Sequence, residues 1–255
     1  MTTGIKTAVI LAAGRGQRLG PAGVEKPKGF MQFGANPIIQ ESVEKLLEQG
    51  ISRIILVVGH LASYYEAFAA QYPGIIELVY NPDFDRSGSM NSLFRARELI
   101  NEDFLLLESD LVYERRALPA VLSAQGDSVL LVSGATGSND EVYVEVQGTQ
   151  LLNLSKQRAQ LTGEVLGELV GITRITLECF GHMCRHAESV FRDTLLLEYE
   201  QAVVAAARQV SVSCYLMDDL QWSEIDTEEH RTRVRERVYP RIQDNDVAYQ
   251  AGRGL

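Results

Sequence analysis

Apolar segments that favour strands alternate with segments of helical periodicity along the first half of the chain. The expected strands are 7–11, 54–58, 75–80, 104–107 and 128–132, and the expected helices are 37–49, 63–71, 90–100 and 118–124. Consecutive parallel strands need a crossover between them, which is usually a helix. The pattern therefore predicts an α/β fold in which helices cover both faces of a mostly parallel sheet.

The second half of the chain has a different pattern. The expected strands there are 142–146, 151–154, 166–174 and 210–216, and the expected helices are 176–191, 198–208 and 228–238. The first three strands follow one another without a helix, which predicts a small antiparallel excursion beside the main sheet. We expect one domain over residues 1–242 and a flexible tail or linker over 243–255, which could lead to a fused or associated partner domain.

Composition and charge exclude several classes of protein. The chain has 255 residues, is 45% hydrophobic, and holds no apolar run long enough to span a membrane. Its start has no signal-peptide layout, and its three cysteines do not suggest a disulfide framework, so we expect a cytoplasmic protein. A net charge of -10 argues against a nucleic-acid partner.

The first expected strand runs directly into a glycine-rich turn. Gly14 and Gly16 let the backbone approach phosphate groups and expose N–H donors to them. Four cations lie in or just after this turn: Arg15, Arg18, Lys26 and Lys28. The turn is not a P-loop, because the Gly-Lys-Ser/Thr ending is absent, and Leu19 takes the place of the third glycine of the dinucleotide fingerprint. The turn therefore predicts a nucleoside triphosphate site of another type.

Two aspartates are candidates for a metal site. Asp110 follows the expected strand 104–107, and Asp226 lies in the late segment Trp222–Thr227. Ligands of open parallel sheets bind beyond the carboxyl ends of the strands, and paired carboxylates suit Mg²⁺. An ordinary acidic turn for Asp110 and a helix cap for Asp226 remain open at this point.

The turn and the segment after it resemble a known signature. Residues 11–19, followed by Pro27 and Lys28, are similar to the motif L-A-A-G-x-G-x-R-[LM] with a later P-K in nucleotidyltransferases that activate sugar phosphates and small alcohol phosphates. The resemblance covers roughly residues 5–240. It implies a Rossmann-like nucleotidyltransferase fold with a mixed, mostly parallel sheet, and transfer of a nucleotidyl group to a phosphate or phosphonate with release of pyrophosphate.

The resemblance also implies roles for individual residues. The implied catalytic residues are Lys28, Arg18, Asp110 and Asp226, with Mg²⁺ as cofactor on Asp110 and Asp226. The implied nucleotide-binding residues of the first turn are Leu11, Ala12, Ala13, Gly14, Arg15 and Gly16.

The segment 81–93 resembles the loop that reads cytosine in phosphocholine and aminoethylphosphonate cytidylyltransferases, which implies CTP as the nucleotide. Ser87, Gly88 and Asn91 are the residues we expect there, although a plain capped helix start is an open alternative. The Gln-x-x-Gly pattern usual in hexose-phosphate uridylyltransferases is missing here, which lowers the sugar reading.

The acceptor site is expected under the strands of the second half. The candidates are Lys156, Glu168, Glu198, Tyr199 and Glu200. Several glutamates favour a primary amine, and hence 2-aminoethylphosphonate, whereas a quaternary ammonium such as phosphocholine would favour aromatic faces. Phosphocholine is the nearest alternative, followed by a sugar-1-phosphate or molybdopterin-type nucleotidyltransferase, or a nucleotide-sensing domain without activity.

Overall fold

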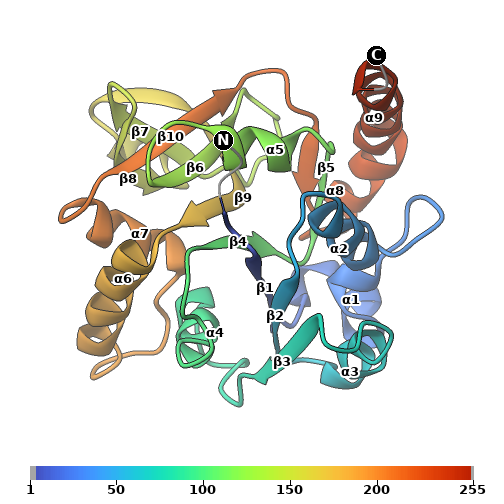
Figure 1. Ribbon diagram of the computed structural model, residues 1–255, viewed down its shortest axis with the longest axis horizontal. Coiled ribbons are helices and arrows are strands. Elements are labelled where there is room, and N and C mark those ends of the chain that lie inside the picture. Colours follow the sequence, from blue (N-terminus) through green and yellow to red (C-terminus); the bar gives the residue numbers. More distant parts are fainter. Residues whose placement is uncertain (1–3, 254–255) are drawn as a thin grey trace.

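A nine-stranded sheet crosses the centre of the protein in the computed structural model, which describes residues 4–253 (Figure 1). Its strand order is β3-β2-β1-β4-β9-β6-β10-β8-β7. The strands are β1 Thr7–Ala12, β2 Arg53–Val58, β3 Ile76–Tyr80, β4 Phe104–Glu108, β6 Ser128–Ser133, β7 Tyr143–Gln147, β8 Gln150–Ser155, β9 Glu164–Ile175 and β10 Val212–Met217. β1 pairs with β2 and β4 in parallel, as the alternating pattern predicts.

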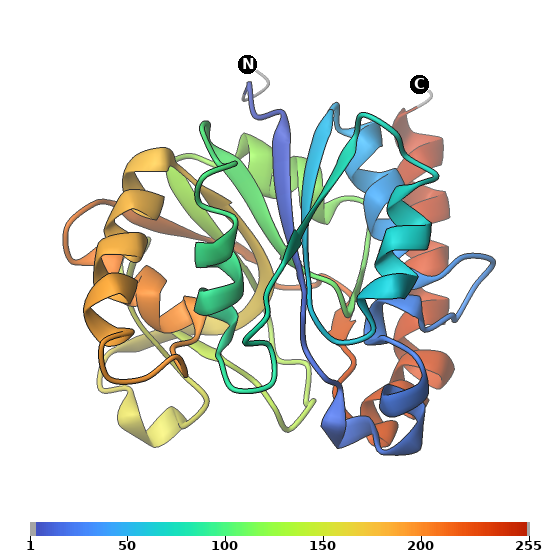
Figure 2. The same ribbon diagram turned by 90° about the horizontal axis from the view of Figure 1, so that it is seen from below.

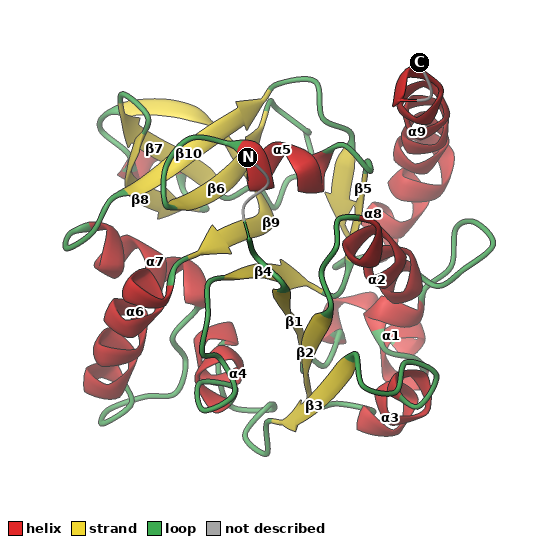
Figure 3. Cartoon of the chain, in the orientation of Figure 1, coloured by secondary structure: helices red, strands yellow, loops and turns green. Residues whose placement is uncertain are grey.

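Helices cover both faces of this sheet (Figures 2 and 3). The helices are α1 Pro21–Glu25, α2 Ile38–Glu48, α3 Ala62–Ala69, α4 Ser89–Arg95, α5 Ala117–Ser123, α6 Leu177–Val190 and α7 Tyr199–Ala207. Short 3-10 turns lie at Gln17–Leu19, Lys28–Phe30 and Arg158–Gln160. Alternate residues of β1 enter two separate cores: Val9 packs with α4, α6 and α7, and Ile10 packs with α2, α3 and α5. This burial on both faces explains why the strand is apolar throughout.

β9 joins the parallel part of the sheet to the antiparallel excursion. It runs antiparallel to β4 and β6 through its second half, and its first half pairs with β7. The β9–β7 pairing closes a circuit of strands through β6, β10, β8 and β7. At the change of partner stands Gly171, whose φ of 79° favours glycine.

The C-terminal helices form a third core with a separate two-stranded sheet. β5 (Leu111–Tyr113) pairs antiparallel with β11 (Trp222–Glu224). After β11 the chain forms α8 (Glu228–Arg233), a π-helical segment (Val234–Val238) and α9 (Tyr239–Arg253). Val112, Ile225 and Val238 are among the buried residues that join these parts.

The expectation of a flexible tail over 243–255 is wrong for residues 243–253, which are helical in α9; residues 254 and 255 lie outside the described part. Side-chain contacts hold this helix against the loop after β5. Asp246 Oδ1 accepts from the Arg115 backbone N–H at 2.7 Å, and Asn245 donates to Glu114 Oε1 at 2.7 Å. None of the helices in the described residues combines the length and apolar character that crossing a membrane requires.

Candidate active site

The glycine-rich turn after β1 forms one wall of a cavity of about 240 Å³. Leu11, Ala12, Ala13 and Gly14 line it, together with Lys28. The remaining lining residues are Tyr65, Phe84, Ser87, Gly88, Ser89, Ser92, Glu108, Ser109, Asp110 and Glu198. The turn therefore brings backbone, a lysine and a carboxylate to one hollow at the carboxyl ends of β1 and β4.

Gly16 and Arg15 do not line this cavity. Gly16 has a φ of 60°, and a Cβ atom there would lie 3.3 Å from Lys28 Cγ. The glycine thus gives the turn its left-handed residue and leaves room for the lysine stem. Arg15 is exposed on the surface of the turn.

A second cavity of about 260 Å³ adjoins the first. The two share Lys28, Ser89, Glu108, Asp110 and Glu198. The second cavity is further lined by Arg18, Leu111, Val142, Lys156, Leu169, Val170, Gly171, Tyr199, Glu200, Trp222, Glu224 and Asp226. Lys28 and Asp110 therefore lie where two adjacent ligands could meet.

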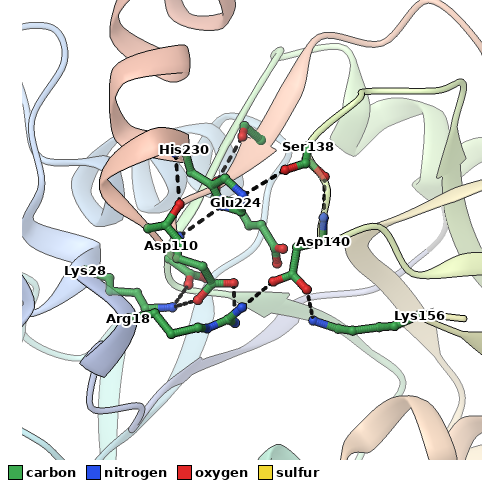
Figure 4. A network of polar contacts seen from close by, with 11 residues as sticks. Arg18, Lys28, Asp110, Ser138, Asp140, Lys156, Glu224 and His230 are labelled. Atoms are coloured by element: carbon green, nitrogen blue, oxygen red, sulfur yellow. Dashed lines mark hydrogen bonds and ion pairs between the residues drawn. The ribbon is translucent and has the colours of Figure 1, made fainter. Parts of the chain in front are cut away.

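Figure 4 shows a network of ion pairs along the second cavity. Lys28 Nζ lies 2.6 Å from Asp110 Oδ2 and also contacts Asp226 Oδ1. Arg18 bridges Asp226 Oδ2 at 2.8 Å and Asp140 Oδ2 at 2.5 Å. Lys156 Nζ contacts Asp140 Oδ1 at 2.6 Å. The network joins residues from five distant segments of the chain.

The electrostatics of this network are set by burial and by the surrounding carboxylates. Burial opposes the charged form of Lys28, but Asp110 and Asp226 outweigh it and raise the pKa of the lysine. Burial, followed by the charges of Asp226 and Asp110, raises the pKa of Glu224 to about 8. Burial, followed by the charges of Asp110 and Glu200, raises the pKa of Glu108 well above its usual range. The site thus holds more negative charge than its own cations neutralise.

The donor set fits a divalent cation. One ammonium group, that of Lys28, touches both Asp110 and Asp226, so a single cation can reach both carboxylates. Glu224 offers a third oxygen donor beside Asp226. His230 lies in the same cluster, but its Nδ1 accepts from the Asp226 backbone N–H at 3.4 Å and its Nε2 is 3.1 Å from Ser138 O. Carboxylate oxygens are the donors that Mg²⁺ prefers, and His230 instead orients the loop that carries Asp226.

Helix α4 brings only part of the predicted base-reading loop to the first cavity. Ser87, Gly88, Ser89 and Ser92 line it, whereas Asn91 is buried and does not. Ser89 and Ser92 are three residues apart and share one face of the helix, so Asn91 points elsewhere. Gly88 is needed for packing, because a Cβ atom there would lie 2.3 Å from Leu197 O.

Three of the four charged candidates for the acceptor line the second cavity, as does Tyr199. Glu198 Oε2 accepts from the backbone N–H and the hydroxyl of Ser89 at 2.8 and 2.6 Å. Tyr199 donates to Glu108 Oε1 at 2.8 Å. Glu200 Oε2 is buried and, among the residues that the structure describes, has no hydrogen-bond partner.

Glu168 is the exception. It does not line the cavity but accepts from the Thr136 backbone N–H at 3.0 Å, and so fastens the loop after β6. A strand alternates its side chains between two faces, and the motif around Glu168 does not say which face meets the cavity.

Sequence reasoning missed Glu108, Asp140 and Glu224. Glu108 and Glu224 each stand two positions before a predicted aspartate, at the ends of β4 and β11, and this spacing is a usable signal. Asp140 lies in the irregular loop between β6 and β7, where nothing local marks it.

The comparisons with known proteins agree with this architecture. A model of the MobA-like NTP transferase domain matches residues 8–139, just over half of the 255 residues. Those residues contain the turn, Lys28 and Asp110, and they include every residue lining the first cavity except Glu198.

Individual relatives extend the match. The CMP-5'-(3-aminopropyl)phosphonate synthase of Streptomyces rubellomurinus is 35% identical over 128 residues, which are 49% of this chain and 20% of the relative. A bifunctional IPC transferase and DIPP synthase from Thermococcus kodakarensis is 26% identical over 233 residues, which are 89% of this chain and 49% of the relative. The chain thus spans between a fifth and a half of the length of these relatives.

A solved structure, the inositol-1-phosphate CTP transferase from T. maritima, has the same fold. It has a TM-score of 0.75 at 20% identity, over 93% of this chain and 99% of that one. The Rossmann-like α/β fold expected from the sequence is thereby confirmed. With the fold, the cavity at the glycine-rich turn and the domain match in agreement, the chain belongs to the family of MobA-like NTP transferase domains and is an enzyme of the nucleotidyltransferase class.

Proposed function

We propose that this protein is a Mg²⁺-dependent cytidylyltransferase that joins CTP to 2-aminoethylphosphonate and releases pyrophosphate. The observation that carries the proposal is the pair of cavities that meet at Lys28 and Asp110. CTP occupies the first cavity, with its base toward Ser87–Ser92 and its phosphates toward the turn at Gly14. The acceptor occupies the second cavity, and the α-phosphorus lies at the junction.

The reaction needs positioning and charge compensation rather than a covalent intermediate on the enzyme. A phosphonate oxygen of the acceptor attacks the α-phosphorus, and the bond from this phosphorus to the bridging oxygen of the β-phosphate breaks. The electron pair of that bond leaves with pyrophosphate. The Lys28 ammonium faces the α-phosphate and the incoming oxygen, the turn amides and Arg15 hold the β- and γ-phosphates, and Arg18 and Lys156 hold the phosphonate. Mg²⁺ held by Asp110 and Asp226 would offset charge on the triphosphate oxygens.

The acid groups of the second cavity support a primary amine as the head group of the acceptor. An ammonium group carries three N–H donors and needs acceptors around it. Glu200 offers a buried carboxylate oxygen that has no partner among the described residues, and Glu198 lies beside it in the lining. Burial of an unpaired carboxylate is costly, so a cationic ligand at this point is favourable. The relative from Streptomyces rubellomurinus makes an aminoalkylphosphonate product, according to its name.

Phosphocholine is the second candidate, and the observation that favours it is the presence of two aromatic residues in the same cavity. Tyr199 and Trp222 both line it and could face a quaternary ammonium. The Tyr199 hydroxyl is engaged by Glu108, however, and Trp222 is buried, donating its indole N–H to Ser133 Oγ at 2.7 Å. Two partly covered rings make a weaker aromatic cage than the glutamates make an amine site.

The experiment is a pyrophosphate-release assay with purified protein and Mg²⁺. CTP, UTP and GTP are each combined with 2-aminoethylphosphonate, phosphocholine and glucose-1-phosphate. We expect release with CTP and 2-aminoethylphosphonate above all other pairs. Release with phosphocholine alone would move the head-group site to the aromatic residues, and turnover of glucose-1-phosphate with UTP or GTP would overturn the cytidylyltransferase assignment.

A further inference from the structure

A third cavity, of about 280 Å³, lies on the other side of Trp222 from the acceptor cavity. Its walls are the loop after β6, the loop before β11 and the C-terminal helices. The lining residues are Gly134, Ala135, Thr136, Asp218, Leu220, Gln221, Trp222, Arg233, Arg237, Val238 and Arg241. Three arginines face a single carboxylate, that of Asp218, in a protein whose net charge is -10. We call Arg233, Arg237 and Arg241 the arginine row.

The arginine row follows one side of the C-terminal helices. Its members are four residues apart, and the π-helical segment Val234–Val238 lies among them. Neighbouring members are separated by about 6 Å along the axis, because a helix rises about 1.5 Å per residue. π-Helical turns are rare and often occur at functional sites. Here the wider turn helps to keep all three arginines on the same cavity.

The outer members of the row are free to bind a ligand. Arg237 and Arg241 are exposed, and within residues 4–253 neither takes part in an ion pair. Arg233 is half-buried and donates to Thr136 O at 3.2 Å. Guanidinium groups bind phosphate oxygens through two parallel hydrogen bonds, so a row of them at a regular spacing suits linked phosphates better than a single one.

The cavity shares structural parts with the active site. Trp222 lines both the second and the third cavity. The loop that begins at Gly134 continues to Asp140, which holds Arg18 and Lys156 in the acceptor cavity. A ligand that draws Thr136 and Arg233 together therefore acts on a loop whose other end reaches the reacting groups.

We propose that the arginine row is a second binding site, distinct from the active site, for a soluble anion with two or more linked phosphate groups. The site is made of exposed guanidinium groups and is independent of catalysis. It is tested by binding alone, so its outcome does not depend on which acceptor the enzyme uses.

The experiment is isothermal titration of the full chain with inorganic tripolyphosphate in the absence of divalent metal. The wild type should show two binding events, one at the glycine-rich turn and one at the arginine row. The double variant R237E/R241E should lose the second event or weaken it at least tenfold. The control R192E/R235E changes the charge equally with exposed arginines that do not line the cavity, one of them on the same helix. It should bind as the wild type does.

Two further arms complete the test. Thermal unfolding of each variant checks folding, and the single variants Arg237→Gln and Arg241→Gln replace the double variant if it unfolds. Co-sedimentation with vesicles of phosphatidylglycerol and phosphatidylcholine probes lipid phosphates as the source. Binding to vesicles without binding of tripolyphosphate would overturn the soluble ligand. Equal binding of tripolyphosphate by wild type, R237E/R241E and control would overturn the site itself.

Discussion

Lys28 is the residue at which the nucleotide and acceptor cavities meet, and its ammonium bridges two carboxylates there. Because it is placed before any ligand binds, it needs no reorganisation when charge develops on the α-phosphate. We expect Lys28→Ala to lower kcat by about 10²–10³-fold, as the loss of one preorganised donor does. Steady-state pyrophosphate release measures this. Lys26→Ala is the matched control, since Lys26 is exposed, lines neither cavity and should keep wild-type turnover. A kcat for Lys28→Ala within threefold of wild type would contradict the mechanism.

Glu200 should set the affinity for the amine end of the acceptor. We expect Glu200→Gln to raise KM for 2-aminoethylphosphonate at least tenfold, the loss of about 1.4 kcal/mol that one charge-assisted hydrogen bond readily supplies. KM for CTP should not change. Glu168→Gln is the control, because Glu168 lies outside the cavity. If both variants raised KM equally, Glu200 would have no special role.

The same carboxylate gives a pH dependence. Burial is the main cause that raises the pKa of Glu200, to about 7. An acid with a raised pKa is neutral below it, so the ammonium finds its charged partner only as pH rises through about 7. KM for the acceptor should therefore fall between pH 6 and 8 in the wild type. The test is the difference between wild type and Glu200→Gln, since the ionisation of the acceptor itself affects both; identical profiles would disprove it.

Residue roles could be predicted from the sequence where a motif fixes the backbone position. Lys28, Asp110 and Asp226 were predicted from the turn and from strand ends, and the structure brings all three together. Glu168 and Asn91 were placed wrongly relative to the cavities, because a motif states which residue is present but not which face of its strand or helix meets the ligand. Asp140 lies in a loop whose path depends on tertiary contacts alone.

At the scale of elements, helix α4 depends on close backbone contact with the segment before α7. The backbone N–H of Gly88 donates to Leu195 O at 2.8 Å, and that of Met90 donates to Leu197 O at 3.1 Å. We expect Gly88→Ala to lower the free energy of unfolding by about 1–3 kcal/mol, the usual cost of overpacking, and to raise KM for CTP. Thermal unfolding and steady-state kinetics measure the two effects.

Gly181→Ala serves as the control for this change. Gly181 lies in α6, where an added Cβ atom comes no nearer than 3.4 Å to Arg185 Nη1. It should stabilise the protein slightly, since alanine is the better helix former. An unaltered melting temperature in Gly88→Ala would show that α4 does not rest on this contact.

Elements of the first half were predicted to within a few residues at most ends, because each strand is an apolar run that both cores bury. α4 was the exception and ends at Arg95, five residues before the expected end. β5 and β11 were not predicted. Each has three residues, too few for a periodic pattern, and they pair across more than a hundred positions of sequence.

At the scale of the whole molecule, α9 is held to the body of the protein by contacts near Asp246. Its carboxylate accepts from the Arg115 backbone N–H and lies 3.6 Å from Arg115 Nε. We expect Asp246→Ala to lower the free energy of unfolding by about 1–2 kcal/mol, because a buried donor then lacks its acceptor. Asp244→Ala, at an exposed position on the same helix, should have no effect on chemical denaturation. Equal stability of the two variants would contradict this role.

The flexible tail was predicted from polar composition, and it was wrong because polarity alone does not exclude a helix. α9 is polar on most sides and packs chiefly at its start, where Tyr239 and Ile242 join the third core. Contacts made by single residues such as Asp246 leave no pattern in the sequence. The domain boundary at 242 therefore stays a prediction.

The division of labour between the two cavities has a consequence for how such enzymes can change. Nearly all of the first cavity comes from the segment that matches the domain model, whereas Lys156, Glu200 and Trp222 of the second cavity come later in the chain. β9 joins both regions through its pairings with β4 and β7. A chimaera that exchanges the chain after β6 for that of a related enzyme could thus acquire a new acceptor while its triphosphate grip is inherited intact.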